Sequence, residues 1–214
     1  MGVRSDSLQT IEENIKKIRP EAKLIIVTKN QNVDDISKLL ENKNYLFGEN
    51  RVQEAVNKYT NLRGRYDFKL HMIGPLQSNK TEVALQTFDV IQSIDRKKII
   101  DSITAAKKKM IEQKIKTKEF FIQVNIGDEP QKSGVTINDL NNLYDYCLEK
   151  KIPVKGLMCI PPNLKTPEFY FNKIFILRDN LDKKLKLSMG MSADYELALK
   201  MQTDYIRVGS LIFN

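Results

Sequence analysis

Residues 24–49 read LIIVTKNQNVDDISKLLENKNYLFGE, and this stretch holds the pattern that decides the fold. Two short apolar runs, residues 24–29 and 45–49, flank an amphipathic segment over residues 33–40. Short runs rich in Val, Ile, Leu and Phe are typical of buried strands, whereas apolar residues at helical spacing are typical of a surface helix. The order strand, helix, strand therefore predicts a parallel βαβ unit.

The same alternation recurs along the rest of the chain. Strands are predicted at residues 24–29, 45–49, 68–74, 90–94, 120–126, 154–160, 185–189 and 205–209. Helices are predicted at residues 33–40, 51–62, 79–86, 96–113, 137–149, 167–181 and 193–201, and an extra N-terminal helix at residues 6–18. Eight strands of this kind favour a closed (β/α)₈ TIM barrel, an α/β fold, over an open doubly wound sheet of roughly five to seven strands.

Composition is that of an ordinary globular chain, with 41% hydrophobic and 29% charged residues among 214. No Ser/Gly-rich stretch marks a linker, so residues 1–214 are predicted to form a single domain. No apolar run approaches the roughly 18 residues of a membrane span, and no secretory leader is evident, so a cytoplasmic protein without membrane contacts is expected. Cys147 and Cys159 are expected to be buried free thiols, and a single histidine excludes a zinc ligand set.

The net charge of +8 raises the question of nucleic-acid binding. The lysines are spread through helical segments, often beside acidic residues, and the densest run, Lys107-Lys108-Lys109, has no aromatic residues among it for base stacking. A solvated surface explains this charge better, so no nucleic-acid partner is expected.

In a TIM barrel the C-terminal ends of the strands carry the chemistry. Polar residues fall at these positions, and we expect them to gather at one mouth of the barrel: Lys29, Glu49, Asn50, Asn125, Ser192, Arg207, Gly209 and Ser210.

Lys29 closes the first predicted strand, on the same face as Ile25 and Val27, which is expected to point into the barrel. An apolar surrounding would disfavour the ammonium, lower the pKa of Lys29 and free an amine that attacks aldehydes. A lysine at a strand end can also simply extend into water, and the residue by itself does not decide between the two.

The segment Arg207-Val208-Gly209-Ser210 suits an anion. Gly209 lets the main chain approach a phosphate, Ser210 offers its N–H and hydroxyl, and Arg207 adds a charged donor. Ser192 is expected at the N-cap of the helix at residues 193–201, where it is either an ordinary cap or part of an anion site at the helix N-terminus.

Several tracts together resemble the pyridoxal phosphate homeostasis protein family, which looks like the barrel domain of alanine racemase standing alone. They keep their order over residues 23–213 and are VTK (27–29), FGENRVQE (47–54), HMIGPLQSNK (71–80), KSG (132–134), GLMCIPP (156–162), SMGMSAD (188–194) and RVGS (207–210).

The resemblance implies that Lys29 holds pyridoxal 5′-phosphate (PLP) as a Schiff base. It also implies that Ser192, Gly209 and Ser210 grip the phosphate, and that Asn50 and Met191 lie near the ring. Arg207 would face the pyridine nitrogen, where a permanent cation disfavours protonation of the ring and makes it a weaker electron sink.

On this resemblance the chain is a PLP carrier that buffers the cofactor and delivers it to apo-enzymes, with no catalytic residues and as a monomer. A PLP-dependent racemase or decarboxylase is the alternative, although 214 residues leave no room for the second domain of the racemases. A phosphosugar-metabolising barrel without PLP would leave Lys29 unexplained.

Some positions depart from the family pattern. Pro75 stands where the family commonly has a second histidine, and Leu70 where it often has tryptophan. His71 matches a family position but is interpreted as a hydrogen-bonded structural residue.

Overall fold

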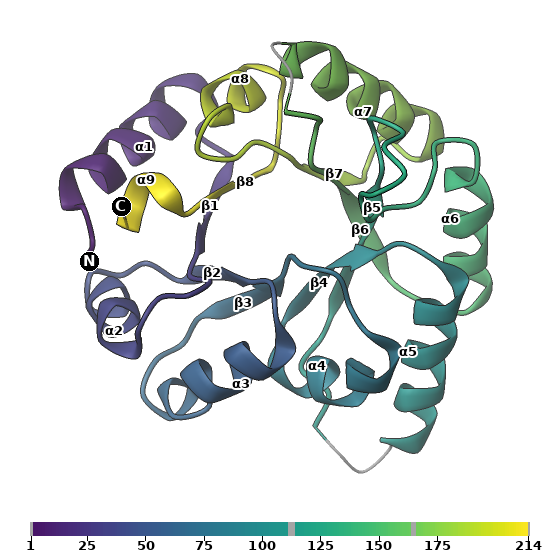
Figure 1. Ribbon diagram of the computed structural model, residues 1–214, viewed down its shortest axis with the longest axis horizontal. Helices are drawn as coiled ribbons and strands as arrows, with labels where there is room; N and C mark the ends of the chain where they lie inside the picture. The colour runs from purple at the N-terminus through teal and green to yellow at the C-terminus, as the bar shows by residue number, and fades with distance from the viewer. Residues whose placement is uncertain (1, 111–113, 164–165, 214) are drawn as a thin grey trace.

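The computed structural model describes residues 2–110, 114–163 and 166–213, and within them eight parallel strands close into a barrel in sequence order (Figure 1). The strands are β1 (Lys23–Val27), β2 (Leu46–Glu49), β3 (Lys69–Met72), β4 (Val90–Ile94), β5 (Glu119–Val124), β6 (Val154–Cys159), β7 (Lys186–Ser188) and β8 (Tyr205–Val208). The predicted α/β fold with a closed eight-stranded barrel is confirmed.

The barrel closes where β1 pairs with β8. Ile25 lies opposite Arg207 and Ile26 opposite Val208 in this register. Because side chains alternate along a strand, Ile25 belongs to a small cluster inside the barrel while Ile26 belongs to the larger core outside it. Arg207 is thereby placed on the inner face, beside the mouth formed by the strand C-termini.

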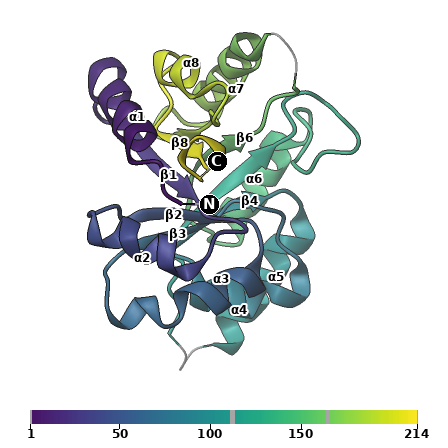
Figure 2. The same ribbon diagram turned by 60° about the vertical axis from the view of Figure 1, so that its left-hand side comes forward.

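Helices surround the barrel as an outer ring (Figures 1 and 2). The described residues form α1 (Ser5–Ile18), α2 (Val33–Glu41), α3 (Val52–Tyr59), α4 (Thr81–Thr87), α5 (Lys97–Lys109), α6 (Leu140–Glu149), α7 (Pro167–Leu181), α8 (Tyr195–Lys200) and α9 (Ser210–Phe213), with short 3₁₀ turns η1 (Leu62–Gly64) and η2 (Ser78–Lys80).

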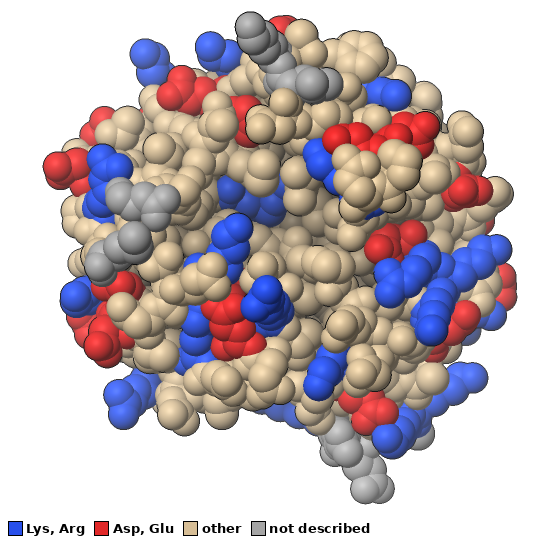
Figure 3. Space-filling model, viewed as in Figure 1, with Lys and Arg blue, Asp and Glu red and all other residues tan. Residues whose placement is uncertain are grey.

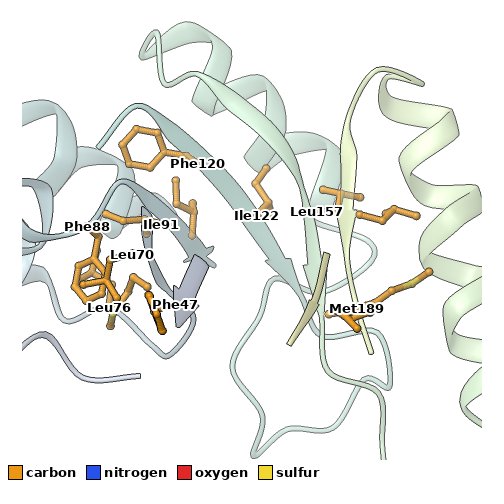
Figure 4. Close-up of a cluster of buried hydrophobic side chains, with 14 of the residues drawn as sticks. Phe47, Leu70, Leu76, Phe88, Ile91, Phe120, Ile122, Leu157 and Met189 are labelled. Atoms are coloured by element: carbon orange, nitrogen blue, oxygen red, sulfur yellow. The ribbon is translucent and has the colours of Figure 1, made fainter. Parts of the chain in front are cut away.

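Most of the apolar core lies between the strands and this ring. Figure 4 shows part of it, with Phe47, Leu70 and Phe88 near one group of strands and Ile122 and Leu157 near another. All five side chains are fully buried. Burying each large apolar side chain contributes roughly 1.5–3 kcal/mol, so this layer supplies the main stabilisation and fixes where the strand ends point.

The extra N-terminal helix α1 covers the seam between β1 and β8. It packs against α8 and α9. The backbone N–H of Arg4 donates to the carbonyl of Ile212 at 2.8 Å, and Nε of Arg19 donates to the carbonyl of Thr203 at 2.8 Å. Both ends of the described chain therefore support the strand pair that carries the mouth.

Several boundaries differ from the predictions. β1 ends at Val27, so Lys29 lies in a turn after the strand, where Asn30 has a φ of 62°. The predicted helix at residues 193–201 begins only at Tyr195. The sequence pattern did not predict α9, whose four residues are too few to show a helical period. The predicted helix at 96–113 ends at Lys109, and residues 111–113 lie outside the described residues.

Other predictions concern the chain as a whole. Cys147 and Cys159 are free and fully buried, as expected, and burial raises the pKa of each thiol to about 12. Among the described helices, none has the length and apolar character to cross a bilayer. The residues that the structure describes contain no group of three or more His, Cys, Asp or Glu side chains able to hold a metal ion.

Candidate functional site

A cavity of about 660 Å³ opens at the mouth formed by the C-terminal ends of the strands. This size suits a small cofactor, since ligand pockets span roughly 300–1,000 Å³. The wall includes all seven residues that the family resemblance assigns to the cofactor: Lys29, Asn50, Met191, Ser192, Arg207, Gly209 and Ser210. The fold thus brings together side chains that lie up to about 180 positions apart in the chain, at the face where TIM barrels carry their chemistry.

The charge of the wall is positive. Lys29, Lys132 and Arg207 line the cavity, and its described lining residues include no Asp or Glu. Figure 3 looks at the face of Figure 1 and shows Lys and Arg side chains around its middle, with some Asp and Glu side chains beside them. A cavity with several cations and no carboxylate favours an anionic ligand.

Lys29 sits at the opening of the cavity rather than deep inside it. Its side chain is exposed to water. The expectation of an amine desolvated by an apolar surrounding is therefore wrong, because the strand stops at Val27 and the next residues turn outward. The inward face expected from strand alternation still applies to Ile25 and Val27, and Val27 lines the cavity.

A cluster of ionised side chains holds the backbone on both sides of Lys29. Nζ of Lys58 donates to the carbonyl of Thr28 at 2.7 Å, and Oε1 of Glu54 accepts from the N–H of Asn30 at 2.6 Å. Lys58 also pairs with Glu54 at 2.5 Å and with Glu49 at 3.1 Å. The contacts from α3 thus fix the backbone of the turn, while the Lys29 side chain remains exposed to water.

Glu49 belongs to this cluster and does not line the cavity. Its side chain is fully buried and accepts from the hydroxyl of Thr28 at 2.7 Å. Burial raises the pKa of Glu49, although Thr28 and Lys58 oppose that rise. The expectation that Glu49 faces the mouth is therefore wrong, because its side chain turns toward α3. Sequence reasoning also missed Lys58, which lies on the buried side of α3 together with Ala55 and Tyr59.

Arg207 is deeply buried, with 3% of its surface exposed. Its guanidinium donates to Oγ of Ser188 at 2.8 Å and to the carbonyl of Cys159 at 2.9 Å. Burial lowers the pKa of Arg207, but an arginine starts so high that it keeps its charge. The cavity therefore contains a permanent cation held by neutral acceptors.

Gly209 and Ser210 follow Arg207 at the end of β8. A Cβ added to Gly209 would lie 2.9 Å from the carbonyl oxygen of Val27. The backbone at the end of β8 therefore lies so close to the end of β1 that a side chain larger than that of glycine would not fit. Ser210 begins α9 and is exposed at the cavity wall. The predicted combination of open backbone, hydroxyl and cation is present in one place.

Ser192 lines the cavity but is not an N-cap. α8 begins at Tyr195, and Asp194 takes the capping position. Oδ1 of Asp194 accepts from the N–H of Met191 at 2.6 Å, and Gly190 has a φ of 92°, so this segment forms a turn before the helix. The expected cap at Ser192 is therefore wrong, and the residue reaches the cavity through the turn.

Asn50 contributes a buried polar atom. Its Oδ1 has no hydrogen-bond partner among the described residues. Gly74 packs directly against it, since an added Cβ there would lie 2.4 Å from the carbonyl oxygen of Asn50. A buried acceptor without a partner is costly unless a ligand supplies a donor, so Asn50 is suited to contact a bound molecule.

The end of β5 and the segment after it also form part of the wall, which the pattern of strand ends did not predict. Gln123, Gln131, Lys132 and Ser133 line the cavity. The N–H of Val135 donates to the carbonyl of Gln123 at 2.8 Å, which folds this segment back onto the strand. The signal available was the tract Lys132-Ser133-Gly134, in which Gly134 has a φ of 127°.

Asn125 was expected at the site and is not part of the cavity wall. Its Nδ2 donates to the carbonyl of Glu129 at 2.8 Å, and its Oδ1 accepts from the N–H of the same residue. Asn125 therefore shapes the turn that carries Lys132. Cys159 is core, as interpreted, and contributes its backbone carbonyl to Arg207.

Comparisons with known proteins show the family and the fold of this chain. Residues 7–214 match the family model for the alanine racemase N-terminal domain. The pyridoxal phosphate homeostasis protein of Aquifex aeolicus is 40% identical over 177 residues, covering 78% of this chain and 75% of the relative. That of Pasteurella multocida is 35% identical and covers 95% of this chain and 97% of the relative.

Solved structures of related proteins have the same fold. PipY of Synechococcus elongatus, solved with PLP bound, superposes with a TM-score of 0.83 at 29% identity and covers 98% of this chain and 99% of that one. Alanine racemase of Acinetobacter baumannii has a TM-score of 0.75 at 16% identity and covers 98% of this chain and 61% of that one. The second likeness concerns the fold alone.

Proposed function

Because the chain belongs to the pyridoxal phosphate homeostasis protein family, we propose that it binds PLP covalently through Lys29, buffers it and delivers it to apo-enzymes. Residues 1–214 would act as one PLP-binding domain. The observation that carries the proposal is the exposed amine of Lys29 at the opening of a cation-lined cavity without carboxylates.

The residues present fit this cofactor. Its phosphate carries negative charge, and the described wall is lined by cations and by no carboxylate. The close approach at Gly209 leaves main chain accessible, and Oδ1 of Asn50 is a buried acceptor without a partner. Each of these features suits a phosphorylated, hydroxyl-bearing ring.

Bound PLP supplies an aldehyde that condenses reversibly with a primary amine. In the proposal, Nζ of Lys29 adds to the aldehyde carbon, a new carbon–nitrogen double bond forms and water leaves. The Lys58 and Glu54 contacts keep the Lys29 backbone in place during this exchange. Access from water lets an incoming amine displace Lys29, which suits release as well as storage.

The other wall residues have separate roles in the proposal. Ser192, Gly209 and Ser210 hold the phosphate, Asn50 and Met191 lie beside the ring, and Arg207 faces the pyridine nitrogen. Arg207 offers only donors, so it favours an unprotonated nitrogen and a weakly activated ring.

A carrier role accords with this wall better than catalysis does. Racemisation needs an acid/base group on each face of the reacting carbon. Among the described lining residues there is no Tyr, His, Cys, Asp or Glu, and Lys132 pairs with Glu129 at 2.6 Å. The proposal therefore assigns no catalytic residue.

An absorption spectrum of the PLP-loaded protein tests the proposal. A band in the visible region that disappears in Lys29→Ala and persists in Lys132→Ala is expected, since both lysines line the cavity but only Lys29 is proposed to bond. A spectrum that matches free PLP in the unmutated protein would contradict covalent binding.

Delivery needs its own test. The loaded protein, which we propose to be a monomer, is mixed with an apo-enzyme that requires PLP, and recovered enzyme activity is followed over time. Recovery faster than PLP dissociation into buffer supports direct delivery, whereas recovery at the dissociation rate supports buffering through free PLP.

A further inference from the structure

A chain of buried polar side chains crosses the barrel beneath the cavity. It runs from Arg207 on β8 through Ser188 on β7 and Gln92 on β4 to His71 on β3, and none of the four is more than 3% exposed. Arg207 donates to Oγ of Ser188 at 2.8 Å, and Ser188 donates to Oε1 of Gln92 at 2.7 Å. Nε2 of Gln92 lies 2.9 Å from Nδ1 of His71. Only Arg207 lines the cavity.

The direction of this chain is set at Arg207. A guanidinium has donors and no acceptor, so Oγ of Ser188 accepts and its own proton points to Gln92. The amide oxygen of Gln92 is then occupied, and its N–H group donates to Nδ1 of His71. This order places the His71 proton on Nε2, which has no partner among the described residues.

His71 can accept only while it is neutral. Burial, with Lys69, Lys186 and Lys23 nearby, lowers its pKa to about 3. The ring of Tyr205 packs against it at 5.6 Å between centroids. A protonated imidazole would present N–H groups at both nitrogens and lose the contact with Gln92, so the chain is intact across the physiological pH range.

We infer that Ser188, Gln92 and His71 form a positioning relay that fixes the guanidinium of Arg207 and the direction of its hydrogen bonds at the cavity wall. Within the described residues Arg207 forms no salt bridge with a carboxylate, and its other hydrogen-bond acceptor is the carbonyl of Cys159. Without the relay only that carbonyl would orient the buried cation. The effect of the relay on the cofactor rests on the proposed function.

The relay is tested first without cofactor, through the nitrogen resonances of the histidine. His71 is the single histidine among 214 residues, so labelling with ¹⁵N-histidine gives one spin system. A neutral ring protonated on Nε2 is expected between about pH 5 and pH 8. A ring protonated on Nδ1, or an imidazolium at about pH 6, would overturn the inference.

Two substitutions of Arg207 distinguish a loss of hydrogen-bond direction from a general disturbance of the fold. Arg207→Lys keeps a group that only donates and should preserve the Nε2–H ring. Arg207→Met removes the donor three links away from His71 and should give a mixture of the two neutral forms. Thermal unfolding verifies that each variant is folded. An unchanged His71 spectrum in folded Arg207→Met would refute the relay.

The second test uses PLP and buried serines. Ser188→Ala and Gln92→Leu should each release PLP about fivefold faster, since each removes about one hydrogen bond of support. The double variant should be no worse than either single variant, because the relay acts as one unit. Ser93→Ala is the matched control, since Ser93 on β4 is equally buried but its Oγ has no partner.

The outcomes are distinguishable. If the unmutated protein never loads PLP, the proposed function fails, and the His71 spectrum alone decides the relay. A second outcome is that PLP loads, that Arg207→Ala releases it faster, and that the relay variants release it at the same rate as Ser93→Ala. In that case the relay fails and the proposed function stands.

Discussion

At the scale of single residues, the distinctive feature is an exposed Lys29 side chain on a firmly held backbone. Its neighbours Thr28 and Asn30 are bound by Lys58 and Glu54. This arrangement leaves the amine able to reach an aldehyde in the cavity and to meet an amine from solvent. It differs from a buried catalytic lysine, which depends on desolvation for its reactivity.

The first prediction concerns the site of attachment. Borohydride reduction of the loaded protein followed by peptide mapping should place the pyridoxyl group on the peptide that contains Lys29, because its amine opens onto the cavity. Lys132 is the internal control, since it lines the same cavity but pairs with Glu129. Label found mainly on Lys132 would refute the assignment.

The second prediction concerns the phosphate. A charge-assisted hydrogen bond contributes roughly 1.5–3 kcal/mol, so Ser210→Ala should speed PLP release by about tenfold or more. Stopped-flow transfer to a scavenging apo-enzyme measures that rate. Ser102→Ala on α5, far from the cavity, should leave it unchanged.

Pyridoxal provides the control for this prediction. It lacks the phosphate, so it should bind weakly to the unmutated protein and lose little more in Ser210→Ala. An equal loss for pyridoxal and PLP would place the effect of Ser210 outside phosphate binding.

At the scale of elements, Lys58 and Glu54 on α3 form hydrogen bonds with the turn after β1, and Lys58 also pairs with Glu49. The pair with Glu49 is buried, with 10% and 0% of the two side chains exposed. Removing one partner of a buried ion pair leaves an uncompensated charge, which costs far more than loss of a surface pair. These contacts therefore stabilise the fold and also hold the turn that carries Lys29.

The third prediction follows from this pair. Lys58→Met should lower the free energy of unfolding by about 3 kcal/mol near neutral pH, measured by urea denaturation. Lys38→Met is the matched control, because Lys38 is 65% exposed and its pair with Asp35 is long at 3.8 Å. It should change the free energy by less than about 0.5 kcal/mol.

The pH dependence of this loss has a definite sign. The folded-state pKa of Glu49 is raised by burial, so the group costs stability as pH rises through that pKa. Without Lys58 the ionised form is disfavoured further. The loss in Lys58→Met should therefore be smaller at about pH 5 than at about pH 8, and an equal loss at both values would exclude ionised Glu49 as its cause.

At the scale of the whole molecule, barrel closure joins β8 to β1 and so brings Arg207, Gly209 and Ser210 beside Lys29. The same closure sends Tyr45 and Tyr205 to the opposite end of the barrel, where their strands begin. The described cavity wall therefore has cations and hydroxyls for binding, but no tyrosine to return a proton across a substrate.

The fourth prediction is the absence of racemase turnover. The loaded protein is incubated with L-alanine in deuterated water, and α-deuterium and D-alanine are both followed. Formation of D-alanine should not exceed that with an equal concentration of free PLP, since racemisation needs two acid/base groups. Saturable D-alanine formation that is lost in Lys29→Ala would favour an enzyme over a carrier.

The sequence by itself determined the architecture and the part of the cavity wall that the strand ends supply. Both depend on local patterns: apolar runs of strand length alternate with amphipathic helices, and polar residues fall where strands end. In a parallel barrel these ends all meet at one mouth, so Lys29, Asn50 and Arg207 could be placed together from their positions alone.

Tertiary structure alone decided how each of these side chains is held. Lys29 is exposed because β1 stops early, Ser192 sits before rather than at the helix cap, and Glu49 turns toward Lys58. The hydrogen bonds from Arg207 through Ser188 and Gln92 to His71 join four strands across sequence separations of 19, 96 and 21 residues. Such contacts depend on strand register and on which face each side chain takes after a strand ends, and no local pattern encodes either.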